Sequence, residues 1–183
     1  MTIQPFPVFE PQPEPVEAPN RLTERDMLAA VRARYAIASQ GVSIRYAIAE
    51  HVQSGAGFDA RRVCDFMALD LWPSKGLHLH GHEVKVSRSD WLRELRDPAK
   101  AEEFRQWCDR WWLVVPDAEI VKPGELPAGW GLIVVTNGMP RIRRQAPTLT
   151  PQPWSRSFRA AFARSVQKTS HRALEDMRER GWL

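Results

Sequence analysis

Two short apolar runs on either side of a turn constrain the fold of this chain more than any other feature of its sequence. Residues 62–71 contain Val, Phe, Met and Leu, residues 77–87 contain two Leu and two Val, and the segment 72–76 between them contains a proline and a glycine. Apolar runs of this length, bounded by turn residues, are typical of β-strands. We therefore expect these two segments to form an antiparallel hairpin.

Charged residues interrupt both runs of this expected hairpin. Asp65 lies in the first, and Glu83, Val84 and Lys85 lie in the second. Because side chains alternate between the two faces of a strand, Glu83 and Lys85 share a face and Val84 points the other way. Pairing of the two strands would bring two carboxylates and one ammonium group together. Asp70 competes with Asp65 for this role, but its odd spacing puts it on the opposite face, so we prefer Asp65.

Such a group of side chains has a chemical use. Two carboxylates are enough to hold a Mg²⁺ ion that keeps several water molecules and takes further ligands from phosphate. A divalent cation at this position can activate water and offset the charge that develops on a phosphoryl group. The pattern thus favours hydrolysis of a phosphodiester bond with Mg²⁺ or Mn²⁺, and it gives no indication of a small-molecule cofactor.

The rest of the chain predicts helices on both sides of the hairpin. Capping and periodicity indicate a helix from Thr23 to about residue 38 and a second over about 43–52. After the hairpin we expect a helix over 90–108, bent or split at Pro98, and a buried strand over 111–115. A second hairpin should turn at Asn137-Gly138, between 132–136 and 141–144. The order predicts an α/β fold with a mixed sheet flanked by helices.

The ends of the chain differ in composition from its middle. Residues 1–21 hold six of the fifteen prolines, which predicts a disordered leader. Residues 22–183 are expected to form a single domain that ends in a basic helix over about 154–180. No apolar run is long enough to cross a membrane, and the two cysteines, Cys64 and Cys108, are predicted to be reduced core residues. A cytoplasmic protein is expected.

Positive charge is concentrated near the C-terminus. Residues 141–183 contain ten Lys or Arg against three Asp or Glu, a balance of +7 in a chain with net charge +4. Such a basic lobe favours a polyanionic partner, because contacts between basic side chains and phosphates release counterions. A solvated face without a ligand is the alternative. The candidate DNA-binding residues are Arg141, Arg143, Arg144, Arg156, Arg159, Arg164 and Lys168.

Two other patterns have both a chemical and a structural interpretation. His78, His80 and His82 alternate along the second expected strand, so they could share a face and bind zinc, or they could form a polar strand face. Tryptophans could stack on bases. We expect most of them in the core, because Trp111 and Trp112 must point to opposite faces of one strand.

The sequence resembles the PD-(D/E)XK nuclease superfamily, and within it the MmcB-like group of bacterial and phage DNA repair proteins. The resemblance covers about residues 45–146. It is carried by the segments 62–65, 81–87, 90–92, 108–112 and 131–134 and by Lys100. It departs from the superfamily pattern in having Cys64, where a proline is common, before Asp65.

The resemblance implies an αβββαβ core and metal-assisted cleavage of a nucleic-acid backbone. Asp65 and Glu83 match the carboxylates that bind the metal, the Val84 carbonyl matches a further ligand, and Lys85 matches the residue that orients water or stabilises charge. The superfamily often adds a glutamate from the helix before the hairpin, for which Glu50 is the best match. We expect a nuclease acting on DNA in repair or phage DNA processing. The alternatives are a DNA-binding module that does not cut and a zinc protein built on the three histidines.

Overall fold

The computed structural model describes residues 22–36 and 44–181, so the expected leader over 1–21 lies outside the described residues. The helices are α1 (Glu24–Tyr35), α2 (Arg88–Arg96), α3 (Pro98–Arg105) and α4 (Arg156–Glu179). The strands are β1 (Tyr46–Gln53), β2 (Val63–Asp70), β3 (Leu79–Val84), β4 (Arg110–Val115), β5 (Trp130–Thr136) and β6 (Met139–Arg144). None of the helices described is long and apolar enough to cross a membrane.

The six strands form one mixed sheet in the order β1-β2-β3-β4-β5-β6. β1, β2 and β3 are antiparallel, β3, β4 and β5 are parallel, and β6 returns antiparallel to β5. Helices α2 and α3 make the crossover between the parallel strands β3 and β4. The predicted α/β class with a mixed sheet is confirmed. The order of elements from α1 to β4 is also the αβββαβ order that the family resemblance implies.

The helix predicted over 43–52 is wrong, because residues Tyr46–Gln53 form β1. Ala49 and Val52 are three residues apart and belong to the same core, which imitates helical spacing. The cause is His51, whose φ of 50° breaks the alternation of the strand. Pairing along β2, from Tyr46 opposite Asp70 to Gln53 opposite Val63, outweighs the local helical pattern.

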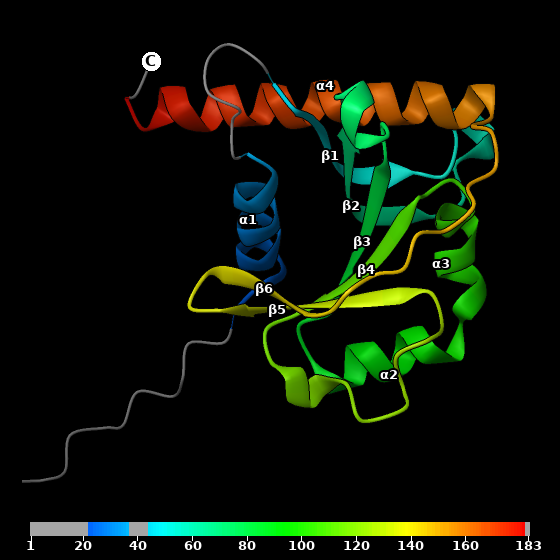
Figure 1. The fold of residues 1–183 in the computed structure, drawn as a ribbon. Helices are drawn as coiled ribbons and strands as arrows, with labels where there is room; N and C mark the ends of the chain where they lie inside the picture. Colours follow the sequence, from blue (N-terminus) through cyan, green and yellow to red (C-terminus); the bar gives the residue numbers. More distant parts are fainter. Residues whose placement is uncertain (1–21, 37–43, 182–183) are drawn as a thin grey trace, which may run out of the picture.

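Helices cover the two faces of the sheet unequally (Figure 1). α2, α3 and α4 pack on one face through Trp91, Phe104, Phe158 and their neighbours, which form one core. α1 covers the other face through Met27 and its neighbours. α4 runs along β1, at one edge of the sheet. The two faces thus have separate cores, and β3 contributes to both.

Local signals account for the ends of several elements. Ser87 caps α2, and Pro98 occupies the first turn of α3, so the helix predicted over 90–108 is split as expected. Asn137 and Gly138 have φ of 51° and 73°, the left-handed values that a two-residue hairpin turn requires. The predicted split at Pro98 and the predicted turn at Asn137-Gly138 are both confirmed.

The two tryptophans of β4 are buried in the cores on the two faces of the sheet. Trp111 and Trp112 are 0% and 2% exposed and belong to opposite cores, as their adjacent positions on β4 predict. A Cβ on Gly81 would lie 2.3 Å from the Trp111 ring, so a glycine is needed where β3 passes it. Cys64 and Cys108 are buried and unpaired, as predicted.

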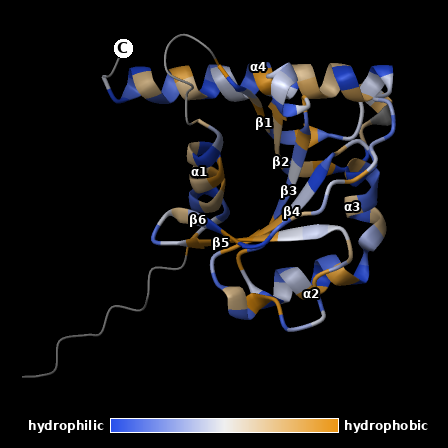
Figure 2. Ribbon diagram, in the orientation of Figure 1, coloured by the Kyte–Doolittle hydropathy of each residue, from blue (hydrophilic) through white to orange (hydrophobic). Residues whose placement is uncertain are grey.

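α4 is amphipathic along most of its length, and Figure 2 shows hydrophilic and hydrophobic segments alternating along it. Phe158, Ala161 and Phe162 are buried, and the basic residues predicted to bind DNA from this helix are exposed. Leu174, near the C-terminal end of the helix, is 48% exposed. The last turns of the helix therefore have less of the sheet to pack against than the sequence pattern suggests.

Candidate functional site

Asp65 lies where β2 separates from β3. The register between the two strands covers Phe66 to Leu69, so Asp65 falls just beyond it. Its Oδ2 accepts a hydrogen bond of 2.7 Å from the Val84 backbone N–H. This contact fixes the Asp65 carboxylate beside the end of β3, where Glu83 and Lys85 are located.

Glu83, Lys85, Glu94 and Lys100 form a closed group of ion pairs, which we call the lysine–glutamate quartet. Lys85 Nζ and Lys100 Nζ both lie 2.5 Å from Glu83 Oε1. Both also lie 3.0 Å from Glu94 Oε2. The Glu83 and Glu94 side chains are only 2% and 5% exposed, so two buried carboxylates are neutralised by two ammonium groups.

The carboxyl groups of Asp65 and Glu83 both have raised pKa values. Burial, followed by the charge of Asp65, raises the pKa of Glu83 to about 7. Burial likewise raises the pKa of Asp65, although the Val84 hydrogen bond opposes this shift. Burial, which disfavours the charged form of a carboxyl group, is therefore the main cause of both shifts.

The other members of the quartet remain charged. Burial disfavours the Lys85 and Lys100 ammonium groups, but the contacts with Glu83 and Glu94 together outweigh it and raise the pKa of both lysines. Burial also disfavours the Glu94 carboxylate, but the two lysines outweigh it and lower its pKa. Glu94 therefore acts as a fixed anion that holds both ammonium groups.

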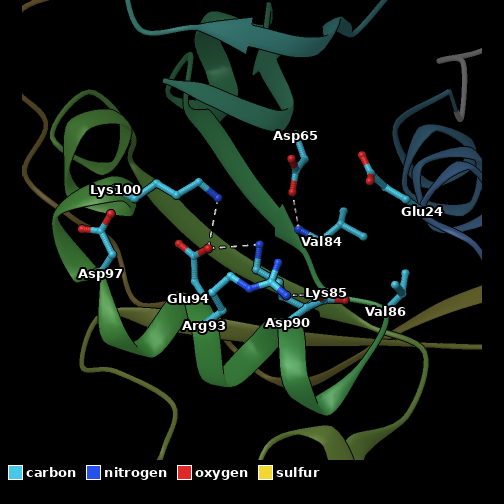
Figure 3. A pocket seen from close by; sticks show the side chains of 10 residues that line it. All are labelled: Glu24, Asp65, Val84, Lys85, Val86, Asp90, Arg93, Glu94, Asp97 and Lys100. Atoms are coloured by element: carbon cyan, nitrogen blue, oxygen red, sulfur yellow. Dashed lines mark hydrogen bonds and ion pairs between the residues drawn. The ribbon is translucent and has the colours of Figure 1, made fainter. Parts of the chain in front are cut away.

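A cavity of about 450 Å³ opens beside the quartet (Figure 3). It is lined by five carboxylates, against three basic side chains, and we call it the acidic cavity. The carboxylates belong to Glu24, Asp65, Asp90, Glu94 and Asp97, and the basic residues are Lys85, Arg93 and Lys100. Glu83 is not part of this lining, although its carboxylate contacts the two lysines that are. The excess of negative charge favours a cation over a bare phosphate.

Glu50, predicted as an additional carboxylate of the site, does not line the acidic cavity. It lies on β1 and not on a helix, and its carboxylate forms an ion pair with Arg32. The helix that precedes the hairpin is α1, and its residue Glu24 lines the cavity with Asp65. The misassignment follows directly from the wrong helix over 43–52, because the glutamate was sought on that segment.

The residues of the cavity fit a divalent cation in charge and donor type. Asp65 of the lining and Glu83 beside it offer oxygen ligands, which Mg²⁺ and Mn²⁺ prefer, and after burial the charge of Asp65 is the next cause of the raised pKa of Glu83. Glu94 Oε1 is buried without a hydrogen-bond partner among the described residues. Across residues 22–36 and 44–181, no three His, Cys, Asp or Glu side chains are already gathered as a ligand set.

The three alternating histidines have separate surroundings. His82 is buried and its Nε2 lies 3.0 Å from the Tyr35 hydroxyl. His80 Nδ1 accepts a hydrogen bond from Trp112 Nε1 at 3.3 Å. His78 precedes β3 and packs near Gly76. The alternation that suggested zinc thus places two of the rings against aromatic side chains.

The basic residues predicted to bind DNA fall into two groups. Arg141, Arg143 and Arg144 lie on β6, while Arg156 and the others lie on α4, which packs against β1. β1 and β6 are the opposite edges of the sheet. The charge that is continuous in the sequence is therefore divided in space, and the expected single basic lobe is not formed.

Asp70, the competing carboxylate, lies at the far end of β2 from Asp65. Its Oδ2 is 2.7 Å from Arg45 Nη2, and its Oδ1 accepts a hydrogen bond from the Trp72 N–H. Asp70 is therefore used to fix the turn after β2.

Sequence reasoning missed two contributors to the site, Glu94 and Glu24, and named Lys100 only as part of the family resemblance. Glu94 and Lys100 come from α2 and α3, where charged residues are ordinarily solvated. Glu94 is 7% exposed, so its role depends on how the crossover helices pack on β3. The only available signal was its spacing of three residues from the buried Trp91, which puts both on one helix face.

Comparisons with known proteins support the fold and leave the function open. No family model matches the chain, and no curated protein matches it. A solved structure of a protein of unknown function from Silicibacter pomeroyi is similar, with a TM-score of 0.53 and 25% sequence identity. The match covers 86% of this chain and 90% of the other.

Proposed function

We propose that this protein is a Mg²⁺- or Mn²⁺-dependent nuclease that hydrolyses phosphodiester bonds in DNA, in repair or phage DNA processing, and that it acts in the cytoplasm. The observation that carries the proposal is the convergence of Asp65, Glu83 and Lys85 at the end of β3, beside a cavity large enough for a phosphate group. The resemblance to the PD-(D/E)XK superfamily assigns the same three residues to metal binding and catalysis.

Asp65 and Glu83, with the Val84 carbonyl, would hold the metal. When bound, Mg²⁺ or Mn²⁺ would lower the pKa of water and offset negative charge on the phosphate. The five carboxylates of the cavity lining make this cation necessary, because a DNA phosphate would otherwise meet net negative charge.

Lys85 supplies a positive charge that is fixed before the substrate arrives. Its side chain is only 11% exposed, and Glu83 and Glu94 hold its ammonium group from two sides. A charge oriented in this way stabilises the negative charge that accumulates on the phosphoryl oxygens as a P–O bond breaks, without reorganisation. Glu94 serves as a positioning residue, since it contacts both lysines and its pKa is lowered.

The exposed arginines of α4 and β6 would contact the DNA backbone. Contacts with phosphates position a duplex without reading its sequence, so we expect binding that weakens with salt and shows little sequence preference.

The experiment is a cleavage assay on plasmid and oligonucleotide DNA with Mg²⁺, Mn²⁺ or EDTA. We expect cleavage by the wild-type protein with either metal, and none with EDTA or in Asp65→Asn. Asp117→Asn, at an exposed position that does not line the cavity, is the matched control and should cleave normally. Metal-dependent cleavage that persists in Asp65→Asn at the wild-type rate would disprove the assignment of the site.

A DNA-binding module without cleavage is the second candidate, and the quartet favours it. Both ammonium groups contact Glu83 Oε1, so a metal that used this oxygen would have to displace at least one of them. DNA binding by the wild-type protein, with no cleavage under any metal and no loss of binding in Asp65→Asn, would establish this function instead.

A further inference from the structure

A second pocket, of about 330 Å³, lies on the face of the sheet that α1 covers. Arg34 comes from α1, Tyr46 from β1, His80 from β3, Arg110 from β4 and Gln145 from the segment after β6. We call it the basic pocket. It uses the start of β3, whereas the acidic cavity uses the end of that strand.

The side chains that line the basic pocket carry a net positive charge. Two guanidinium groups line it, and no acidic side chain of the described residues does. Asp70 is close enough to affect His80 and Tyr46, but it is bound by Arg45. Arg34 and Arg110 therefore retain positive charge that no lining carboxylate compensates, which favours an anion.

The donors of both arginines are incompletely used. Arg34 Nε is buried without a hydrogen-bond partner in the described part of the chain. Arg110 Nη1 donates to the Ala146 carbonyl at 2.5 Å, the one hydrogen bond that this group of five N–H donors makes to residues 22–36 and 44–181. A guanidinium group presents its donors as a planar fork that matches two oxygens of a phosphate.

His80 adds a neutral donor to the same pocket. Burial, followed by the charge of Arg110, lowers the pKa of His80 to about 4, so its ring is uncharged near neutral pH. Because its Nδ1 accepts the Trp112 hydrogen bond, the ring proton must be on Nε2. The imidazole therefore offers an N–H group, and the Gln145 amide can donate as well.

The volume of the pocket and the aromatic residues in its lining favour a ligand larger than inorganic phosphate. A pocket of this size lies in the range of small-molecule sites. Tyr46 is half-buried, with its ring 4.9 Å from that of Tyr35 and its centroid 4.8 Å from the Arg45 guanidinium, so a planar group can contact only the part of the ring that these two leave uncovered.

We propose that the basic pocket binds a nucleoside monophosphate, with Arg34 and Arg110 holding the phosphate and Tyr46 contacting the base. The same chemistry is presented by a free nucleotide and by the 5′-phosphate end of a DNA strand. The proposal does not depend on the nuclease function, because no residue of this pocket belongs to the acidic cavity.

The test is calorimetric titration of the full chain with thymidine monophosphate in EDTA, so that no metal-dependent cleavage occurs. We expect saturable binding that weakens about tenfold or more in Arg34→Gln and in Arg110→Gln, because each removes a forked contact to phosphate. Arg25→Gln, an exposed change on the same helix, is the matched control and should bind within about twofold of wild type.

Additional variants and ligands distinguish the free nucleotide from a DNA strand end and control for misfolding. Arg34→Lys should retain folding and recover only part of the affinity, and circular dichroism checks each variant. Inorganic phosphate should bind more weakly than the nucleotide, and Tyr46→Ala should remove that difference. Tighter binding of a 5′-phosphorylated than a 5′-hydroxyl oligonucleotide, lost in Arg34→Gln, assigns the pocket to a strand end; equal binding assigns it to the free nucleotide. No saturable binding at up to about 10 mM nucleotide, or binding that both arginine variants retain, would overturn the proposal.

Discussion

The two ends of β3 offer surfaces of opposite charge. At the end, Glu83 and Lys85 adjoin the acidic cavity, where five carboxylates outnumber three basic side chains. At the start, His80 lines the basic pocket, where two arginines meet no acidic side chain of the described residues. The two surfaces share no lining residue and adjoin opposite ends of the same strand. One strand thus contributes to a cavity whose charge favours a cation and to a pocket whose charge favours an anion.

The largest expected difference between the two regions concerns cleavage. Lys85→Met should slow metal-dependent cleavage by about 10²–10³-fold, because it removes a fixed charge beside the developing phosphoryl charge. Nucleotide binding at the basic pocket should not change, as measured by calorimetry on the same preparation. Lys122→Met, an exposed substitution, is the control. A cleavage rate within a few-fold of wild type would remove Lys85 from the proposed mechanism.

A second difference concerns stability. Glu94→Gln should lower the free energy of unfolding by about 3 kcal/mol, because it leaves two partly buried lysines with one shared carboxylate. Urea denaturation measures this change. Glu102→Gln on α3 removes a pair that is largely exposed and should cost about 0.5 kcal/mol or less. Equal effects of the two changes would show that the quartet does not hold the crossover helices on β3.

A third difference is the pH dependence of cation binding. Since burial and Asp65 raise the pKa of Glu83 to about 7, a cation must displace its proton below that pH. Mn²⁺ binding should therefore strengthen about tenfold from about pH 6 to pH 8, as measured by titration calorimetry. Glu83→Gln should bind more weakly at every pH and lose this dependence.

The stability of the metal-free protein should depend on pH in the opposite direction. Because the pKa of Glu83 is raised from its usual value of 4.5 to about 7 by folding, its contribution to the free energy of unfolding should fall as the pH rises from about 4.5 to about 7.

The smallest effect per residue is expected on DNA affinity. Each phosphate contact removed should reduce the slope of log K against log salt by about 0.9. Replacing the basic residues of α4 by Gln should reduce this slope more than replacing those of β6, because α4 packs on β1, next to the strand that carries Asp65. Filter binding over a range of salt concentrations measures both sets. A larger loss from the β6 set would place the DNA along the opposite edge of the sheet.

Much of the fold could be predicted from local signals. The hairpin, the split of the helix at Pro98 and the turn at Asn137-Gly138 each follow from residues that restrict the backbone or alternate in polarity. The one wrong element, β1, failed because His51 interrupts its alternation and Ala49 and Val52 then bury three residues apart. That error also led to Glu50 in place of Glu24, since a strand was taken for the helix before the hairpin.

The sequence by itself determined that Glu83 and Lys85 share a face, because alternation is a property of any strand. It also determined the opposite burial of Trp111 and Trp112. Only the tertiary structure decided that Glu94 and Lys100 close the quartet around Glu83, that Glu24 reaches the acidic cavity, and that the C-terminal positive charge is divided between two edges of the sheet. These arrangements depend on how helices pack across strands, and spacing along a chain does not encode the distance between elements that meet only after folding.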